Sequence, residues 1–156
     1  MNSSPKVIEF LNEALTAELT AINQYFAHAK LCQNWGWARL AEKYREESIE
    51  EMRDAERLTD RIILLGGMPN LQRLGSVRVG ETPLEQLQLD RKLEEAAVEM
   101  YRRGVSLTLE EGDPGTREML EDLVVGEEDH LDWIETQLHA IDVIGIERYL
   151  QSQLYS

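Results

Sequence analysis

The chain has 156 residues, enough for one domain with a well-buried core, and its 42% hydrophobic and 29% charged residues are typical of a folded globular protein. The formal net charge of -14, from 30 acidic and 16 basic side chains, argues against nucleic acid and anionic membranes as partners, because both are polyanions. Cys32 is the only cysteine, which excludes an intrachain disulfide and a cysteine metal cluster.

We expect a single domain over residues 1–156. Residues 1–11 lack a basic segment followed by an apolar run, so no signal peptide is expected. No stretch approaches the roughly 18 apolar residues that a membrane span needs. Together with the single cysteine, these features predict a reducing, cytoplasmic location.

The first two predicted helices are joined by a short turn. Ser4 supplies an N-cap and Pro5 takes the first helical position, so the first helix begins there. It runs to about Gly36, because glycine at that point can end a helix. The second helix is predicted from about residue 37 to the glycine pair at 66–67.

Two further long helices and a short tail helix follow. Residues 82–85, Thr-Pro-Leu-Glu, combine a capping box with proline at the first helical position and open the third helix. Residues 112–115, Gly-Asp-Pro-Gly, end that helix and begin the fourth, with Asp113 as the N-cap. Gly145 ends the fourth helix, and the tail helix is predicted from about 146 to 154.

The three connections between the long helices are unequal in length, and this predicts the topology. Two are tight, so the first and second helices, and the third and fourth, should be antiparallel neighbours. The middle connection, residues 67–82, spans about 50 Å when extended, enough to return along a helix of about 45 Å. The predicted fold is therefore all-α: a ferritin-like four-helix bundle with one long crossover and a short fifth C-terminal helix.

Each long helix carries residues spaced three and four apart that form the stripe expected to face the bundle core. An acidic residue interrupts every stripe near its middle. In chain order the stripes are Ile8, Leu11, Leu15, Glu18, Ile22, Tyr25 and Ala29; Leu40, Tyr44, Glu47, Glu51, Asp54 and Leu58; Leu84, Leu87, Arg91 (a polar exception), Glu94, Val98, Tyr101 and Val105; and Leu120, Leu123, Glu127, His130, Ile134 and Ile141.

Four carboxylates converging in a core would be untenable without cations, because an unpaired buried charge is very costly. Salt bridges to Arg61 or Arg91 are one alternative to a metal. The spacing favours the metal. Glu127-x-x-His130 puts a carboxylate and an imidazole one helical turn apart on one face, and Glu51-x-x-Asp54 does the same with two carboxylates. Oxygen ligands with imidazole suit two iron or manganese ions better than copper(I) or structural zinc.

With their flanks, these residues resemble the bacterioferritin family over essentially the whole chain. The matching segments are ELTAINQYF at 18–26, NWG at 34–36, ESIEEM at 47–52, GMPNLQ at 67–72 and HLDW at 130–133. Members of this family form hollow shells of 24 subunits, oxidise ferrous iron, store a ferric mineral and bind haem b between subunit pairs. The resemblance implies a ferroxidase with a di-iron centre. Its expected catalytic and metal-binding residues are Glu18, Glu51, Glu94, Glu127 and His130, with Glu51 and Glu127 bridging both irons.

The sixth ligand position departs from the family, which has histidine where this chain has Asp54. Five carboxylates would crowd the empty site, so we expect some to stay protonated until metal enters. Asp54 either coordinates the second iron in an oxygen-richer site or falls short and leaves a slow ferroxidase. We favour the second outcome, because catalytic geometry tolerates little slack.

Met52 is a candidate haem ligand by the same resemblance. It lies about 100° around its helix from Glu51, so it should point away from the metal core. In a two-fold dimer, a Met near the axis meets its own copy. Two thioethers could then bind one haem iron, which is the role of this Met in the family.

Other candidates carry less weight. His28 and His139 are expected at the surface. Tyr25 and Trp133 are expected to pack in the core, close enough to the metals to donate electrons. Glu47 is either an iron relay on the cavity side or part of a solvated acidic face. The same two interpretations apply to the nearby Glu50.

Four functions remain open at this point. The first is iron storage with ferroxidase chemistry. The second is a haem-bearing subunit with an impaired ferroxidase site, which supports electron transfer for iron release in a mixed shell with a sister subunit. A ferredoxin-type electron donor is the expected redox partner of either. A rubrerythrin-like di-iron oxidase is less favoured, because its iron-sulfur domain needs four cysteines. A purely structural bundle would leave the buried acids unexplained.

Overall fold

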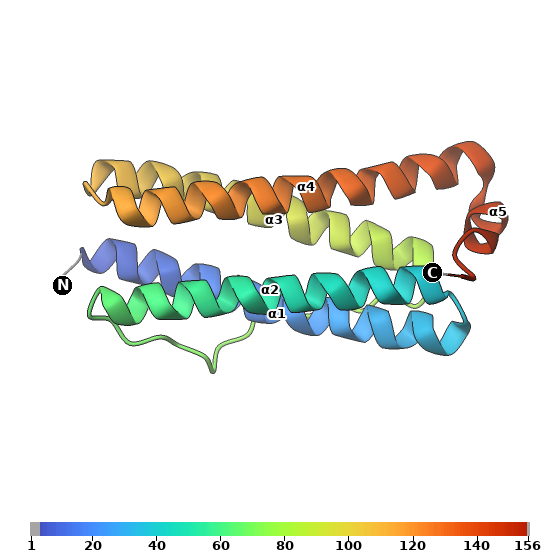
Figure 1. Ribbon diagram of the computed structural model, residues 1–156, viewed down its shortest axis with the longest axis horizontal. Helices are drawn as coiled ribbons and strands as arrows, with labels where there is room; N and C mark the ends of the chain where they lie inside the picture. Colours follow the sequence, from blue (N-terminus) through green and yellow to red (C-terminus); the bar gives the residue numbers. More distant parts are fainter. Residues whose placement is uncertain (1–3, 156) are drawn as a thin grey trace.

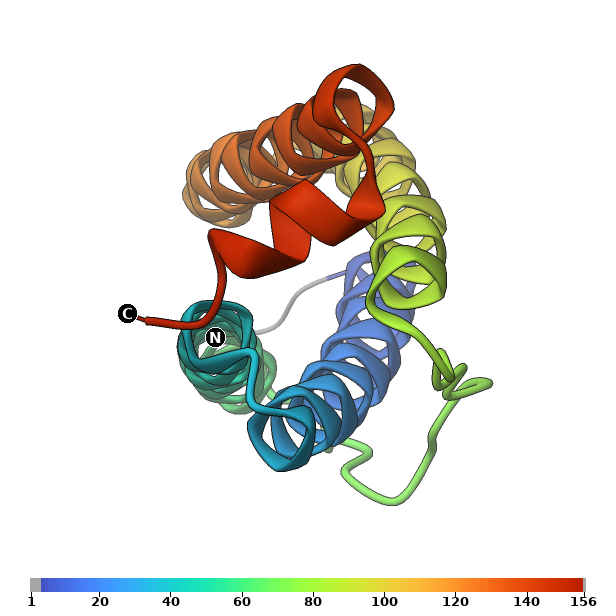
Figure 2. The ribbon, with the colours of Figure 1, turned by 90° about the vertical axis from the view of Figure 1, so that its right-hand side faces the viewer.

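The structure is a computed structural model that describes residues 4–155. Residues 1–3 and 156, which the predicted single domain includes, lie outside the described part. Five helices follow one another along the chain: α1 (Pro5–Trp35), α2 (Ala38–Leu64), α3 (Pro83–Glu110), α4 (Pro114–Ile144) and α5 (Ile146–Gln151). The four long helices form an elongated bundle, and α5 lies across one end of it (Figures 1 and 2).

Local capping explains where the helices begin. Ser4, Thr82 and Asp113 each accept a hydrogen bond from a backbone N–H two or three residues further on, and a proline follows each of them. Gly36 ends α1 with a φ of 91°, a left-handed conformation that glycine adopts readily. The predicted starts of α1, α3 and α4 and the predicted end of α1 are confirmed.

Two other boundaries differ slightly from the prediction. The helix α2 ends at Leu64, because the backbone turns at Gly66 with a φ of 87°. The tail helix α5 ends at Gln151 and not at residue 154. The Ser152 N–H donates to the carbonyls of residues 148 and 149, and this satisfies the last carbonyls of α5. The helix therefore ends before residue 154.

The predicted topology is confirmed. The helix α1 packs against α2 and α3, and α3 packs against α4. The connection from α2 to α3, residues 65–82, leaves one end of the bundle and runs along its side to the point where α3 begins (Figure 1). No helix within residues 4–155 is both long enough and apolar enough to cross a membrane.

Polar side chains of α1 hold this crossover in place. Asn12, Thr20, Gln24 and His28 accept hydrogen bonds from the backbone N–H groups of residues 70, 75, 78 and 80 at 2.7, 2.8, 3.2 and 2.9 Å. The prediction that His28 is a surface residue is therefore wrong, since its exposed fraction is 0%. His139 is exposed, as predicted.

The third helix places Asp90, not Arg91, in its inward stripe. Asp90 is fully buried, accepts a hydrogen bond from Gln24 at 2.9 Å, and lies 3.0 Å from His28 Nδ1. Arg91 is exposed and pairs with Glu95. Both residues fit a spacing of three or four, but only Asp90 finds buried partners, so the predicted polar exception at Arg91 is wrong.

The apolar core consists of two clusters, one toward each end of the bundle. One includes Phe10, Leu15 and Leu58, and the other includes Leu40, Leu87 and Ile134. The acidic stripe positions lie between them in all four helices. The bundle therefore has a polar layer at mid-length, closed off by apolar packing on both sides.

Candidate metal centre

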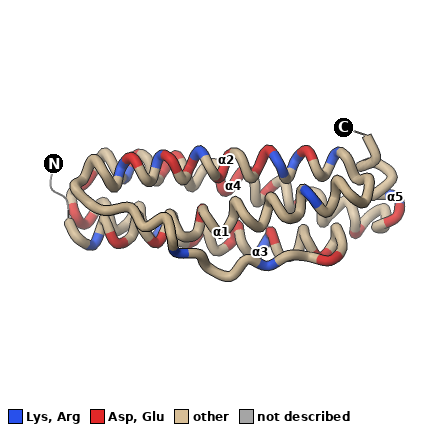
Figure 3. Tube along the Cα trace, turned by 90° about the horizontal axis from the view of Figure 1, so that it is seen from below, with Lys and Arg blue, Asp and Glu red and all other residues tan. Residues whose placement is uncertain are grey.

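The polar layer gathers the predicted ligands from four helices. Five of its residues are almost fully buried: Glu18 on α1, Glu51 on α2, Glu94 on α3, and Glu127 and His130 on α4. Acidic positions recur all along the helices (Figure 3), so acidity alone does not mark a site. Burial distinguishes these five from the acids on the solvated faces.

Asp54 lies within reach of this cluster. One carboxylate oxygen each of Glu18, Glu51, Asp54 and Glu127 can be chosen so that all four lie within 4.8 Å of one another. Asp54 itself is half-buried. This placement supports the first of the two alternatives for Asp54, in which it coordinates a metal ion despite being shorter than histidine.

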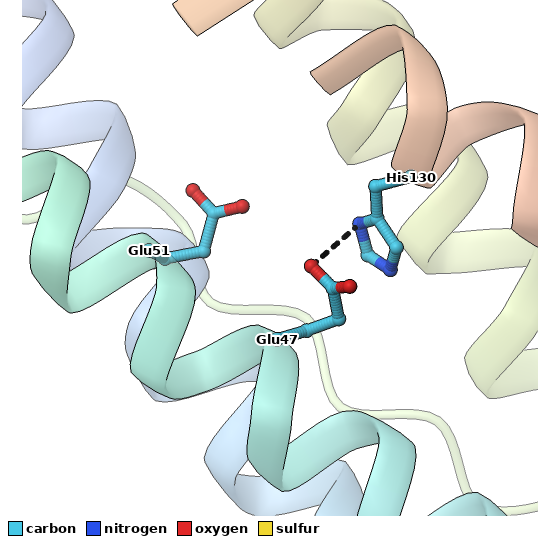
Figure 4. A group of neighbouring side chains, drawn as sticks. All are labelled: Glu47, Glu51 and His130. Carbon is cyan, nitrogen blue, oxygen red and sulfur yellow. Dashed lines mark ion pairs between the residues drawn. The ribbon is translucent and has the colours of Figure 1, made fainter. Parts of the chain in front are cut away.

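A second group joins α2 to α4. Ligand atoms of Glu47, Glu51 and His130 also lie within 4.8 Å of one another, and Figure 4 shows both glutamates projecting from the same helix. His130 Nδ1 is 3.4 Å from Glu47 Oε2 and 3.2 Å from Glu94 Oε1. Glu47 is buried, so its interpretation as a solvated-face residue is wrong.

Glu50, in contrast, is exposed and pairs with Arg53, as a solvated face requires. The arginines that were the alternative to a metal also pair elsewhere. Arg91 bonds to Glu95, and Arg61 bonds to Asp113 and Thr116 at the start of α4. Neither arginine neutralises the buried acids.

Several buried oxygens in the layer receive no hydrogen bond from an N–H or hydroxyl group. Within residues 4–155 these are the Oε2 atoms of Glu18, Glu94 and Glu127, and the carboxyl of Glu127 is close enough to share a proton with those of Glu18 and Glu94. Such groups are rare in folded proteins because an unsatisfied buried polar atom costs free energy. Three in one layer, together with an adjacent imidazole, fit hard cations such as iron or manganese.

The pKa values of the acids in the layer agree with a cation-binding site. Burial raises the pKa of Glu18 to about 8 and that of Glu94 to about 7. Burial and the neighbouring carboxylates raise the pKa values of Glu51 and Glu127 well above their ordinary range. The expectation that some acids stay protonated without metal is supported, because a cation must displace these protons to bind.

The imidazole shows the opposite shift. Burial lowers the pKa of His130 to about 4, although the nearby charges of Glu47 and Asp90 raise it. His130 is therefore neutral at physiological pH. A neutral imidazole retains a nitrogen lone pair for metal binding, which a protonated one lacks.

Two pockets give access to the layer from different sides. A pocket of about 420 Å³ opens between α2 and α4, and its walls include Glu47, Glu50, Asp54 and Asp129. A smaller pocket of about 240 Å³ lies between α1 and α3 and reaches Glu18, Glu51, Glu94 and Glu127. The acidic lining of the larger pocket raises the local concentration of cations at its mouth.

Aromatic side chains surround His130. Tyr25 is fully buried, as predicted, and its hydroxyl donates to Glu94 Oε1 at 2.5 Å. The ring of Trp133 stacks on His130 with 6.0 Å between centroids. Sequence reasoning placed Tyr101 in the core but missed that its hydroxyl donates to Glu18. Electron donation by Tyr25 or Trp133 stays a prediction.

Fold and site together define a class of protein: a ferritin-like bundle with carboxylates and histidine at its centre. The description "Ferritin-like domain" belongs to the family whose sequence pattern matches residues 8–144. Bacterioferritin from Streptomyces coelicolor is 51% identical over 152 residues, which cover 97% of this chain and 91% of that protein. Bacterioferritin from Mycobacterium leprae is 48% identical over 149 residues, covering 96% and 94%. Bacterioferritin from Rhodobacter capsulatus is 46% identical over 145 residues, covering 93% and 90%. This chain belongs to the bacterioferritin family.

Proposed function

We propose that this chain is an iron-storage subunit that oxidises ferrous iron with dioxygen at its mid-bundle layer. The observation that carries the proposal is the buried cluster of carboxylates and His130, in which several oxygens receive no hydrogen bond from an N–H or hydroxyl group of the part of the chain that the structure describes. A purely structural bundle leaves those oxygens unexplained. Ferritin-like fold and bacterioferritin relatives support iron as the substrate.

The residues of the layer form two adjacent positions for ferrous iron. Glu18, Glu51, Asp54 and Glu127 hold one ferrous ion, and Glu94 and His130 complete the position beside it. Glu51 and Glu127 lie between the two. Close pairing would let two ferrous ions give one electron each to one dioxygen, which takes up two protons and leaves as hydrogen peroxide. The carboxylates would stabilise the two ferric ions as hard anionic ligands.

Stopped-flow oxidation of ferrous iron tests this proposal. With increasing ferrous ion added to metal-free protein in air, the fast phase should saturate at about two ions per subunit, as a paired site requires. A fast phase that never saturates, or none above the rate in buffer, would contradict the proposal.

Substitution Asp54→His is expected to raise the initial rate of ferrous oxidation. Burial and the charge of Glu18 raise the pKa of Asp54 to about 7, so part of these carboxyls is protonated at neutral pH. Histidine is longer than aspartate, and at about pH 7.5 an imidazole of ordinary pKa is mostly neutral and offers a nitrogen lone pair to a metal. The gain should be at least about twofold at that pH. Equal rates at that pH would show that Asp54 is an adequate ligand.

A second candidate function is that of a haem-bearing subunit with a weak ferroxidase site. Such a subunit would support electron transfer for iron release in a mixed shell. The exchange at Asp54 favours this alternative, whereas the reach of Asp54 to the other ligands favours the ferroxidase. The Asp54→His comparison therefore also separates the two functions.

Haem fits the outer face of α1 and α2. Met52 is 56% exposed, and Phe26 and Ile49 are exposed apolar side chains nearby on these helices. Ser48 Oγ donates to the Ile22 carbonyl at 2.9 Å, which puts these stretches of the two helices side by side. A flat, largely apolar group covered by a second copy of this face would bury them, and Met52 would supply the thioether ligand.

Substitution Met52→Leu should abolish haem binding while leaving the fold intact, because leucine keeps the volume and removes the sulfur. Haem per subunit, measured by absorbance of the purified protein, should fall at least about tenfold, a typical loss for a metal-site residue. Met68→Leu is a matched control, since Met68 is also exposed but lies on the crossover. Normal haem content in Met52→Leu would rule out this ligand.

The assembly and setting of the protein are proposed on resemblance. Bacterioferritin relatives support a multi-subunit shell, and we propose 24 subunits built from two-fold dimers. Whether the shell contains this chain alone or a sister subunit too, a ferredoxin-type protein is the proposed electron donor. The proposed location is the cytoplasm.

A further inference from the structure

The helices α1 and α3 carry the same pair of residues at the same spacing. Glu18 is followed seven residues later by Tyr25, and Glu94 is followed seven residues later by Tyr101. Seven residues make about two helical turns, so each glutamate and its tyrosine lie on the same face of their helix. All four side chains are buried in the bundle.

The two pairs exchange hydrogen bonds across the bundle. Tyr25 on α1 donates its hydroxyl to Glu94 Oε1 on α3, and Tyr101 on α3 donates its hydroxyl to Glu18 Oε1 on α1. Each glutamate is therefore held by the helix opposite its own. Burial raises the pKa of both tyrosines, which keeps their hydroxyls protonated as donors.

This exchange leaves the same atom free on both glutamates. In Glu18 and in Glu94, Oε1 accepts from a tyrosine, while Oε2 is buried and receives no hydrogen bond from an N–H or hydroxyl group of residues 4–155. A carboxylate that bound metal through both oxygens would have to give up or share the tyrosine bond. Both tyrosine bonds are buried, and they become charge-assisted, and therefore stronger, once a cation displaces the proton of the glutamate.

We propose that Tyr101 and Tyr25 are positioning residues that make Glu18 and Glu94 one-oxygen ligands, each presenting only Oε2 to a metal ion. The inference rests on the proposed metal-binding function of this layer. Fewer oxygens per glutamate leave coordination positions open on each metal, which dioxygen needs in order to approach. Tyr101 gives the cleaner test, because Tyr25 also lies 3.3 Å from His130 Nδ1.

Cobalt(II) is a suitable probe because it does not require oxygen chemistry and its visible absorption reports coordination number. Metal-free native protein, Tyr101→Phe and Tyr44→Phe are titrated with cobalt(II). Tyr44 is a matched control: it is a buried tyrosine of the same core, and its hydroxyl has no hydrogen-bond partner within residues 4–155. Native protein and Tyr44→Phe should give the same intense spectrum.

In Tyr101→Phe, Glu18 is free to bind through both oxygens, so the coordination number should rise. Absorbance per bound cobalt should then fall at least about twofold, because geometry governs these spectra. A spectrum identical to that of native protein and Tyr44→Phe would overturn the positioning role. Failure of native protein to bind cobalt at the layer would instead contradict the proposed function itself.

A crystal structure of cobalt-loaded native protein tests the inference even if Tyr101→Phe does not fold. The expected result is Glu18 and Glu94 each bound to metal through one oxygen, with the tyrosine bonds on the other oxygen retained. Both oxygens of Glu18 on the metal, with Tyr101 displaced, would overturn it.

Discussion

Replacement of Glu127 by alanine is expected to abolish the fast phase of ferrous oxidation, with a loss of at least about 100-fold. Glu127 shares one set of ligand oxygens with Glu18, Glu51 and Asp54, and its own Oε2 is buried without an N–H or hydroxyl donor among the described residues. Removing it therefore affects both proposed iron positions at once. Loss of Glu18 alone, or of Glu94 alone, would affect only one of the two iron positions.

The adjacent residue supplies the control for this experiment. Glu128 also lies on α4, but it is exposed and pairs with Arg102 on α3. Glu128→Ala should oxidise ferrous iron at the native rate, because exposed ion pairs contribute little to stability. Stopped-flow traces compare the fast phase of ferrous oxidation in native protein, Glu127→Ala and Glu128→Ala. A rapid phase of native size in Glu127→Ala would show that oxidation occurs elsewhere.

The metal-free protein is expected to lose stability as the pH rises from about 5 to 8. Glu18, Glu94 and Asp54 have folded pKa values of about 8, 7 and 7, well above the ordinary values of 4.5 for glutamate and 3.8 for aspartate. Between those limits the folded state binds more protons than the unfolded state, so stability decreases with rising pH. His130 opposes this between about 4 and 6.5, because its folded pKa is lowered.

The carboxyls outnumber the single histidine, so their effect prevails. A net shift of one pKa unit is worth about 1.4 kcal/mol, or about 3 to 6 °C in a domain of this size. Thermal unfolding of metal-free protein at pH 5 and pH 8 measures the loss, and saturating zinc should remove it by neutralising the acids. The double variant Glu18→Gln/Glu94→Gln should show a flatter profile. A melting temperature that rises toward pH 8 without metal would contradict the account.

Much of the centre could be predicted from sequence because helical periodicity fixes which residues share a face. Glu18, Glu51, Glu94 and Glu127 each interrupt an apolar stripe, and an acid within such a stripe is conspicuous. The reach of Asp54 could not be predicted in the same way. It depends on the separation of α2 from α1 and α4, which a stripe does not encode.

The path of the crossover could not be predicted from the sequence, and this caused the wrong prediction for His28. His28 lies outside the apolar stripe predicted for its helix, a position that is commonly exposed. It is buried because residues 65–82 cover that side of α1 and because Asp90 on α3 pairs with its ring. The spacing of Thr20, Gln24 and His28, four residues apart, was the available signal, but it has no meaning without the path of the crossover. Similarly, Tyr101 could be assigned to the core, whereas its bond to Glu18 requires the register between α1 and α3.

Crystals of the metal-free protein soaked anaerobically in ferrous iron would show where the iron binds. We expect two iron positions in the polar layer. One lies among the oxygens of Glu18, Glu51, Asp54 and Glu127, and its neighbour contacts Glu94 and His130. Anomalous density for iron confined to the exposed acidic faces, with the buried layer empty, would contradict the claim that this layer is the iron-oxidising centre.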